Sequence, residues 1–553
     1  MKQCSIKYIC LSVLTLLVAG VGGCKKLLTE KPSSFLTTDQ FYKTASDAEL
    51  AITGVYEILN AVDVQGNGNQ PMWGATMQYL TTMGCDEQIG DVTFLAGQPN
   101  FLSLCNYTYT SENTLLWYTY AALYAGINRA NFVIERVPSI DMDTTRRGQI
   151  VAEARFFRGL YYSYLGWFWG GVPLADSSVV SPTAPRASMQ QMMQHAMADL
   201  TYAYNRLPVR NKFDGRVNKY TAEGFLAKLN LYIASCKENN VGQSLNFPLN
   251  SFDWVDAPSA YQRALQYCQD IYTNSGYTLL KPFNYLFLAA TKATARSEHM
   301  MIVQTGAGGN QENIVYSYLA GPAGAYNTTG GTYGWVRPVR EGYNRFNSND
   351  GRRSLSFSGA MPSSATTTPF ETIGGYKYFI PSAIVTNLSN MSICKWRLDN
   401  PVDRINRGVP NWAGDIDWGV LRYGDVLLMY AEAKYKTGDE TGARALFSEL
   451  RTRAVAGDLT KLSTITTAYH KTDFMQELLD ERSRELLGEG WRRFDLIRTG
   501  KLKSVVAAMD PSAMFPREDV KTVQANFADN KIWYPLPSRE ISTNSNLVQN
   551  PGY

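Results

Sequence analysis

Glu485 and Glu489 are two carboxylates at a spacing that could support acid/base chemistry. Side chains four residues apart lie on one face of a helix, and paired carboxylates can act as the acid and the base of a hydrolytic reaction. Arginines alternate with these carboxylates between residues 481 and 498. Because neighbouring arginines hold a carboxyl group in its ionised form, they would prevent it from acting as a general acid. We therefore interpret the cluster as an ion-pair network that joins helices.

Other charged residues also lie within otherwise apolar helical segments. Charges in such positions need partners, and the forked guanidinium group of arginine fits a carboxylate. The expected network comprises Glu153, Arg155, Arg158, Arg422, Asp425, Glu432, Glu481, Arg482, Arg484, Glu485, Arg492, Arg493, Asp495 and Arg498.

Further motifs of catalysis and metal binding are missing from the sequence. Its three histidines, His195, His299 and His470, lie outside any His-Glu-x-x-His motif, and we interpret them as surface residues. No Gly-x-Ser-x-Gly nucleophile motif occurs, and the glycine tracts lack the lysine of a phosphate-binding loop. We therefore expect no catalytic, cofactor-binding or metal-binding site, and no enzymatic activity.

The cysteines indicate neither a disulfide framework nor a zinc site. Five cysteines follow Cys24, which is an odd number, and no Cys-x-x-Cys pair occurs. We expect these five to be buried small hydrophobic residues. They are Cys85, Cys105, Cys236, Cys268 and Cys394.

The composition is that of a globular protein. Of the 553 residues, 45% are hydrophobic and 18% are charged. The formal net charge is +4 and no basic run occurs, which argues against nucleic acid as a partner. Aromatic residues reach 12%, which suits either thick helix packing or a surface that binds carbohydrate or peptide.

The start of the chain has the organisation of a bacterial lipoprotein leader. Two lysines precede an apolar run from Ile9 to Val21, which is too short to span a bilayer comfortably and is typical of a signal peptide. Small residues at positions 22 and 23 precede Cys24 as in a lipobox, so Cys24 is expected to carry a diacylglycerol and an acyl chain such as palmitate. The alternative is an ordinary secretory peptide with a cysteine nearby. We assign residues 1–23 to the signal peptide and residues 24–38 to a lipidated tether.

Helical periodicity on more than one face marks several segments. From Ile150 to Phe168, apolar residues recur every three or four positions on two neighbouring stripes. Segments that start at Thr221 and Leu421 repeat this pattern, and Ser188 and Gln191 form the capping box of another helix. A helix that is apolar on two sides must be covered on two sides, as in a stacked helical array.

One helix pair matches a tetratricopeptide unit. Gly438 allows a tight turn, Ala443 allows a close helix approach, and Phe447 fills the groove between the helices. Between residues 239 and 418, Gly, Ser, Thr, Asn and Pro are frequent and helical stripes are absent, which predicts loops. The sequence therefore predicts a mostly α protein, a tetratricopeptide-like helical array with a large loop-rich insertion. Its predicted regions are an N-terminal helical region at 39–238, a loop-rich ligand-binding insertion at 239–418 and a C-terminal helical region at 419–553.

Several longer motifs follow one another along the chain. The first is AEARFFRGLYYSYL at 152–165, followed by GVPL at 171–174. The next are LRYGDVLLMYAEA at 421–433 and ERSRELLGEGWRRFDLIR at 481–498. Shorter motifs are DQFY at 39–42, GVY at 54–56, YPLP at 534–537 and QNPGY at 549–553. In this order they resemble the signatures of the SusD/RagB family of nutrient-binding outer-membrane lipoproteins. Gly424, Asp425 and Gly488 depart from the usual family residues, which concerns packing more than function.

The resemblance implies a protein that is anchored by lipid in the outer membrane and faces the exterior. Such a protein captures an oligosaccharide, or in some members a peptide, and delivers it to a SusC-like TonB-dependent transporter. It binds its ligand without chemistry. Two other classes stay open: a lipid-anchored glycoside hydrolase with its carboxylates in the insertion, and a scaffold that only holds a partner protein.

Aromatic and arginine side chains among glycine and small polar residues are the candidates for ligand contact. Aromatic rings stack on sugar rings, and arginine bonds their hydroxyl groups. Aromatic residues in such loops lack the periodicity of a core. The candidates are Trp73, in the loop from Gln65 to Gln78, and Tyr333, Trp335, Arg337, Tyr343 and Arg345.

We predict that mass spectrometry of the mature amino terminus will show a diacylated or triacylated Cys24, because the short apolar leader ends in Gly-Gly-Cys. A Cys24→Ala protein should leave the membrane fraction. A free terminus at another residue, or a variant that still partitions fully with membranes, would contradict lipid attachment at this residue.

Overall fold

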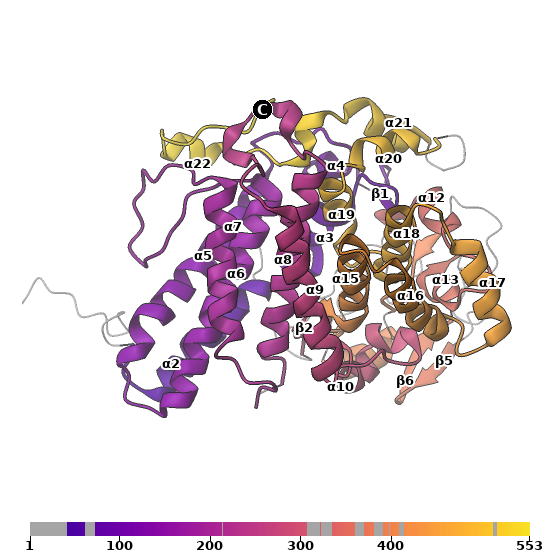
Figure 1. The fold of residues 1–553 in the computed structure, drawn as a ribbon, viewed down its shortest axis with the longest axis horizontal. Helices are drawn as coiled ribbons and strands as arrows, with labels where there is room; N and C mark the ends of the chain where they lie inside the picture. The colour runs from indigo at the N-terminus through magenta and orange to yellow at the C-terminus, as the bar shows by residue number, and fades with distance from the viewer. Residues whose placement is uncertain are drawn as a thin grey trace, which may run out of the picture.

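The computed structural model describes residues 41–60, 72–93, 95–212, 214–306, 321, 334–359, 370–380, 391–397, 399–408, 414–511 and 517–553. The expected signal peptide, the tether with Cys24, and Tyr333 lie outside these residues. Within them the protein is mostly helical, as predicted (Figure 1).

The helices differ widely in length. They are α2 (Ala45–Tyr56), α3 (Met77–Thr82), α4 (Pro99–Cys105), α5 (Thr114–Arg136), α6 (Thr144–Trp169), α7 (Met189–Tyr204), α8 (Lys219–Glu238), α9 (Ala257–Asn274), α10 (Lys292–Ala295), α12 (Arg340–Asn344), α13 (Gly351–Ser356), α14 (Pro401–Asn406), α15 (Tyr423–Lys436), α16 (Glu440–Ala454), α17 (Leu459–Tyr469), α18 (Phe474–Leu486), α19 (Arg492–Arg498), α20 (Leu502–Ala508), α21 (Arg517–Asn526) and α22 (Ser538–Thr543). None of these described helices is both long enough and apolar enough to cross a membrane.

The strands are short and pair two by two in antiparallel fashion. β1 pairs with β3, β2 with β8, β4 with β7, and β5 with β6. They are β1 (Gln88–Gly90), β2 (His299–Val303), β3 (Val336–Pro338), β4 (Phe357–Ser358), β5 (Phe370–Ile373), β6 (Tyr376–Phe379), β7 (Ser392–Ile393) and β8 (Trp418–Arg422).

The long helices form one continuous array. α5 packs on α6, α6 on α7, α7 on α8 and α8 on α9. α9 then packs on α15, and α15 packs on α16 and α18, so the array crosses Figure 1 from left to right. The prediction of a tetratricopeptide-like array is confirmed.

The helix α6 is buried on two sides, as its two apolar stripes predict. From Ile150 to Trp169, every side chain except that of Arg155 is buried. The ring of Phe157 is fully buried, with ring centroids of Tyr56 at 4.3 Å and Phe156 at 5.2 Å. α5 and α7 cover the helix from either side.

Two local predictions on helix ends are also confirmed. Ser188 accepts a hydrogen bond from the Gln191 backbone at 3.2 Å and returns its own N–H to the Gln191 side chain at 2.8 Å, which caps α7. Gly438 has a φ of 96° in the turn between α15 and α16, a conformation that favours glycine. Ala443 and Phe447 are buried in the contact between those two helices.

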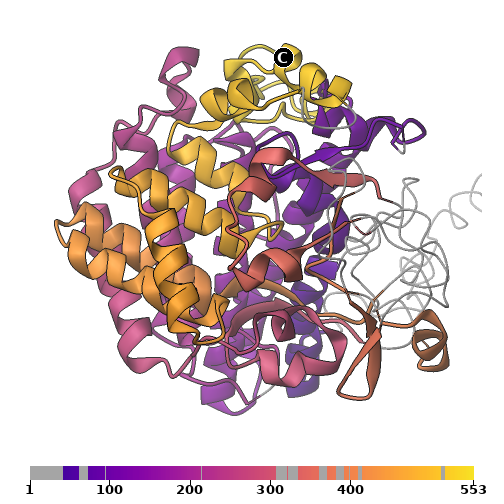
Figure 2. The same cartoon turned by 90° about the vertical axis from the view of Figure 1, so that its right-hand side faces the viewer.

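The segment 239–418 contains a long helix, although the sequence analysis assigned this whole segment to the loop-rich insertion. α9 shows an apolar face of residues Ala260, Ala264, Cys268 and Ile271, and this face packs into the array. The loop-rich part therefore begins after α9. Figure 2 shows the strands and short helices of this part towards the right of the helices. All five cysteines are buried and free, as expected.

We predict that Phe157→Ala lowers the free energy of unfolding by about 3–5 kcal/mol, because it removes a fully buried ring from the centre of the array. Urea denaturation measures this change. Leu50→Ala in α2 is the control: Leu50 is 60% exposed, so its loss should change stability by no more than about 0.5 kcal/mol. Equal effects of the two substitutions would contradict the burial of α6.

Candidate functional site

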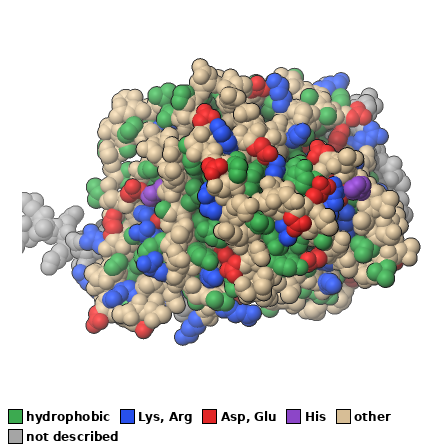
Figure 3. All heavy atoms as spheres, viewed as in Figure 1, with side chains coloured by type: hydrophobic (Ala, Val, Ile, Leu, Met, Phe, Trp, Pro, Cys, Tyr) green, Lys and Arg blue, Asp and Glu red, His purple; other side chains and the backbone are tan. Residues whose placement is uncertain are grey.

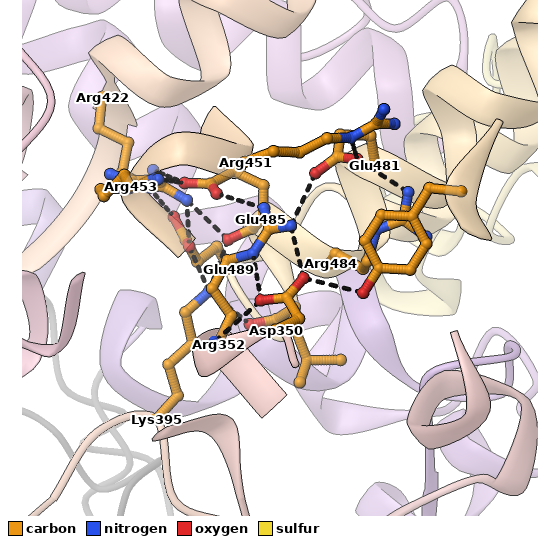
Figure 4. A network of polar contacts seen from close by, with 12 residues as sticks. Asp350, Arg352, Lys395, Arg422, Arg451, Arg453, Glu481, Arg484, Glu485 and Glu489 are labelled. Carbon is orange, nitrogen blue, oxygen red and sulfur yellow. Dashed lines mark hydrogen bonds and ion pairs between the residues drawn. The ribbon is translucent and has the colours of Figure 1, made fainter. Parts of the chain in front are cut away.

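Glu485, the first carboxylate of the pair with acid/base spacing, is fully buried at the end of α18. Its Oε1 accepts hydrogen bonds from Arg422 at 2.6 Å and from Arg453, and its Oε2 accepts one from Arg352 at 2.9 Å (Figure 4). Burial alone would raise the pKa of this carboxyl. The charges of Arg453, Arg422 and Arg352 outweigh burial and hold the pKa well below its ordinary value.

Glu489 has a similar environment. Arg422 donates to its two oxygens at 2.7 and 2.8 Å, and Lys395 donates at 2.5 Å. Burial raises the pKa of the Glu489 carboxyl, but the charges of Arg422 and Lys395 lower it further than burial raises it. Both carboxyls are therefore ionised at neutral pH and hold no proton to donate. The prediction of an ion-pair network in place of an acid/base pair is confirmed.

This network joins the loop-rich part of the chain to the array. Arg422 ends β8, immediately before α15, and Arg453 belongs to α16. Arg352 belongs to α13, and Lys395 follows β7. Further bonds in the network run from Arg352, Arg451 and Arg484 to Glu481, from Arg422 and Arg453 to Glu298, and from Arg352 and Tyr469 to Asp350.

The other predicted charged residues also have partners. Asp425 accepts from Lys228 at 2.5 Å and from Arg482 at 2.9 Å, and these two cations outweigh burial and lower its pKa to about 2. Further pairs are Arg158 with Asp199, Arg492 with Asp86, Arg498 with Glu432 and Asp495, and Glu153 with Arg146 and Arg216. Arg493 differs, because it donates to Tyr107 and to the Lys531 carbonyl. On the face drawn in Figure 3, charges of both signs are interspersed.

The candidate ligand surface lies where β1 and β3 pair, and Asp91 holds it together. The Asp91 backbone donates to the Trp335 carbonyl at 2.8 Å, and its Oδ2 accepts from Arg337 at 3.2 Å. Its Oδ1 accepts from the Thr93 backbone at 2.9 Å. Asp91 thus contacts two candidate residues, the backbone of Trp335 through its N–H and the side chain of Arg337 through its carboxylate. Sequence analysis missed Asp91, because an isolated Asp in a loop carries no motif.

Trp335 stays a candidate for ligand contact. Its ring is half-buried, with its centroid 6.0 Å from that of Phe101 on α4. Val92 and Thr93, in the loop after β1, are exposed. The Asp91 backbone bonds the Trp335 carbonyl, which places Trp335 near the exposed residues Val92 and Thr93. This arrangement suits stacking against a flat ligand face.

Other candidates are engaged within the protein. Trp73 is only 2% exposed and its ring meets that of Tyr164 edge-on at 5.0 Å, so the expectation of an exposed loop aromatic is wrong for this residue. Tyr343 is 9% exposed and accepts a hydrogen bond from Arg353.

The two arginine candidates are also bonded. Arg345 donates to Asp86 and to Ser483, the latter at 3.1 Å. Arg337 is buried beside Asp91. The structure thus places Arg337 on β3 and Trp335 immediately before that strand. It places Trp73 in the core.

The histidines agree only in part with the expectation of surface residues. The His470 side chain is 60% exposed. His195 lies near Asp199 and Asp176, and its side chain is 20% exposed. His299 is buried on β2, which corrects the expectation for that residue.

Two family models match separate parts of the chain. The model described as starch-binding associating with outer membrane matches residues 40–231, and the SusD family model matches residues 365–553. The starch-binding protein SusD of Bacteroides thetaiotaomicron is 25% identical over 98% of both chains. A SusD-like protein of Formosa agariphila is 24% identical over 99% of both chains.

Solved structures share the fold over nearly the whole chain. The surface glycan-binding protein A from Bacteroides thetaiotaomicron in complex with laminarihexaose has a TM-score of 0.70 at 21% identity, over 92% of this chain and 100% of that one. A laminarin-binding SusD-like protein has a TM-score of 0.66 at 20% identity, over 93% and 100% of the two chains.

We predict that Glu485→Gln lowers the free energy of unfolding by about 3–5 kcal/mol, because three buried arginines lose the negative charge that they share. Asp529→Asn is the control. Asp529 pairs with Lys503 at the surface, where the side chains are 43% and 71% exposed, and its loss should cost less than about 1 kcal/mol. Chemical denaturation measures both, and similar losses would show that the Glu485 pairs contribute no more than a surface pair.

We also predict how this difference depends on pH. The pKa of Glu485 lies well below its ordinary value of 4.5 in the folded protein. Its contribution to stability is therefore complete above the pKa of the unfolded chain and decreases as the pH falls from there towards the folded pKa. Between about pH 7 and about pH 3 the wild type should lose more stability than Glu485→Gln. Parallel curves for the two proteins would be inconsistent with a lowered pKa.

Proposed function

The chain belongs to the SusD-like family, and we propose from this membership that it captures oligosaccharides at the surface of an outer membrane. The observation that carries the proposal is the full-length relation to the starch-binding protein, which aligns over 98% of both chains. The folds of laminarin-binding and laminarihexaose-bound proteins agree with it. A peptide ligand is the alternative within the family.

Binding without chemistry is the mechanism that these residues support. SusD-like proteins are binding proteins and not enzymes, and the carboxylates of this chain with acid/base spacing are buried and ionised. At the candidate surface, the Trp335 ring would stack on a sugar ring while polar groups of the loop after β1 bond its hydroxyls.

Delivery to a SusC-like TonB-dependent transporter completes the proposal. The lipidated Cys24 would anchor the protein in the outer membrane, and the polar tether at 24–38 would let it reach a barrel beside it. Failure of the protein to co-purify with a barrel transporter from detergent-solubilised native membranes would contradict this part.

We predict saturable binding of an oligosaccharide without turnover. Titration calorimetry with laminarihexaose and with maltohexaose tests the two glycan types that the relatives suggest. Trp335→Ala should weaken binding of the glycan about tenfold, because loss of one stacked ring costs about 1–1.5 kcal/mol. Trp254→Ala, which removes another half-buried tryptophan, should leave affinity unchanged and should lower the melting temperature at least as much.

Three outcomes would overturn parts of this proposal. Release of shorter sugars during the titration would identify a hydrolase. If the wild type bound neither glycan, both proposed glycan types would be excluded. Equal affinities of wild type and Trp335→Ala would move the site away from β3.

A further inference from the structure

The loop that joins α6 to α7 exposes adjacent apolar side chains. Val179 is 85% exposed and Val180 is 45% exposed, and Val179 has the largest exposed fraction among the exposed large hydrophobic residues of the described chain. Pro182, close behind them, is also exposed. Single apolar residues at a surface are ordinary, whereas neighbouring ones mark a contact with another apolar phase or molecule. We call residues 179–182 the valine tip.

Hydrogen bonds to α5 hold the chain that leads into the valine tip. The Asn131 side chain donates to the carbonyls of Ala175 and Ser177 at 2.7 and 3.0 Å. Glu135, one turn further along α5, accepts from the Ser178 backbone at 2.8 Å and from its hydroxyl at 2.5 Å. The residue directly before Val179 is therefore attached to the array.

The chain that leaves the valine tip is held as well. Asn546 donates to the Thr183 carbonyl at 2.8 Å, and Asn544 donates to the Ala184 carbonyl at 2.7 Å. The tip thus lies between two attached stems, one on α5 and one on the C-terminal segment. Its exposure follows from the way the stems are placed.

The described chain begins beside the same end of α5. Phe41 is the first residue of the described part, and the ring of Tyr42 stacks on that of Phe132 in α5 with centroids 6.5 Å apart. Phe132 and Glu135 lie within one helical turn of each other. The tether therefore joins the folded protein about one turn from the bonds that hold the valine tip.

The tether ends at Cys24, the residue proposed to carry the lipid. The chain from Cys24 to Phe41 can extend over at most about 60 Å, so this end of α5 stays near the membrane surface. α17 lies at the other end of the array, on the right of Figure 1, whereas α2 and α5 lie on the left.

The charges around the valine tip are of both signs. Lys43 and Arg136 are exposed on one side, and Asp176 is exposed on the other, with a side chain that is 65% exposed. Attraction between these charges and lipid headgroups would largely cancel. A contact with a membrane must therefore come from the apolar side chains.

We propose that the valine tip inserts into the interfacial layer of the membrane that holds the lipid anchor. The inference rests on the lipid attachment proposed for Cys24. Transfer of exposed valine side chains out of water is favourable. Insertion is shallow, because the backbone of the tip and the Ser181 hydroxyl need water or headgroups as partners.

This contact limits how the protein is oriented on the membrane. A lipid anchor alone lets the folded part rotate about its tether, and a second contact beside the tether removes much of that freedom. Two valines bind more weakly than an acyl chain, so the contact does not hold the protein on the membrane without the anchor.

The test uses the mature chain, residues 24–553, with Cys24→Ala, so that the valine tip is examined without the lipid. Co-sedimentation with an excess of phosphatidylethanolamine and phosphatidylglycerol vesicles measures the partition coefficient. Val179→Asp should lower it about tenfold, because a charge replaces an inserted valine. Leu459→Asp is the matched control: Leu459 is 75% exposed at the start of α17, so partitioning should be unchanged. Both variants should keep the melting temperature.

A fluorescent label locates the contact. The five cysteines after Cys24 are buried, so Val180→Cys in the Cys24→Ala chain adds one accessible thiol. An environment-sensitive label on it should shift its emission to shorter wavelength when the vesicles are added. The same label on Leu459→Cys should show no shift.

Each outcome supports or overturns the insertion. Unchanged partitioning of Val179→Asp, or no shift of the label at position 180, would overturn it. An equal loss in Leu459→Asp, or partitioning that disappears with added salt, would show general or electrostatic adsorption and would also overturn it. If the native protein carried no lipid while the Cys24→Ala chain still bound vesicles through Val179, the insertion would be supported and lipid attachment at Cys24 contradicted.

Discussion

Arg422 donates hydrogen bonds to Glu298, Glu485 and Glu489 in an interior where an unpaired charge would be strongly destabilising. These partners come from separate parts of the chain: Glu298 precedes β2, Glu485 lies at the end of α18, and Glu489 follows that helix. Every one of them must be in place before the guanidinium is satisfied. The hydrogen bonds of the network therefore form in one relative placement of the helical array and the loop-rich part. Apolar packing alone tolerates small shifts. The candidate ligand surface is linked to this junction, because β3 packs against β7 and Lys395, which follows β7, belongs to the network.

Sequence patterns predicted the helical array because each of these patterns depends on residues that are close together in the chain. The stripes of α6, the capping box at Ser188 and the turn at Gly438 each depend on residues within one or two helical turns. α9 was assigned to the loop-rich insertion although its apolar residues follow helical spacing, because it lies beside long polar and glycine-containing stretches that dominate the composition of the segment. The ion-pair network was predicted in kind, since charges in apolar helices need partners. Its particular pairs, such as Arg352 with Glu481, join residues distant in sequence and left no local signal.

The accessibility of the ligand candidates was less predictable, because it also depends on residues that are distant in sequence. Trp73 follows a glycine-rich loop, yet it lies at the start of a helical turn that leads into α3 and packs against Tyr164 of α6. Arg345 looked available in sequence, but Asp86 accepts its hydrogen bonds from far along the chain. The composition around a residue can indicate a loop. It does not indicate which distant residues contact that loop in the folded protein. Trp335 kept its partial exposure, and Asp91, which fixes its backbone, could be found only in the structure.

The separation of scaffold and surface explains how one array can serve different ligands. Residues of the network are buried and mutually dependent, so replacing one leaves several others unpaired. Trp335 and Val92 belong to the strand edge and the loop after β1 and not to the buried ion pairs, and the side chain of Val92 is exposed. In the proposed site, specificity can therefore vary at the strand edge while the arginines and carboxylates of the network stay fixed. This also accounts for a chain whose signature motifs indicate its family but lie outside the surface proposed to contact the ligand.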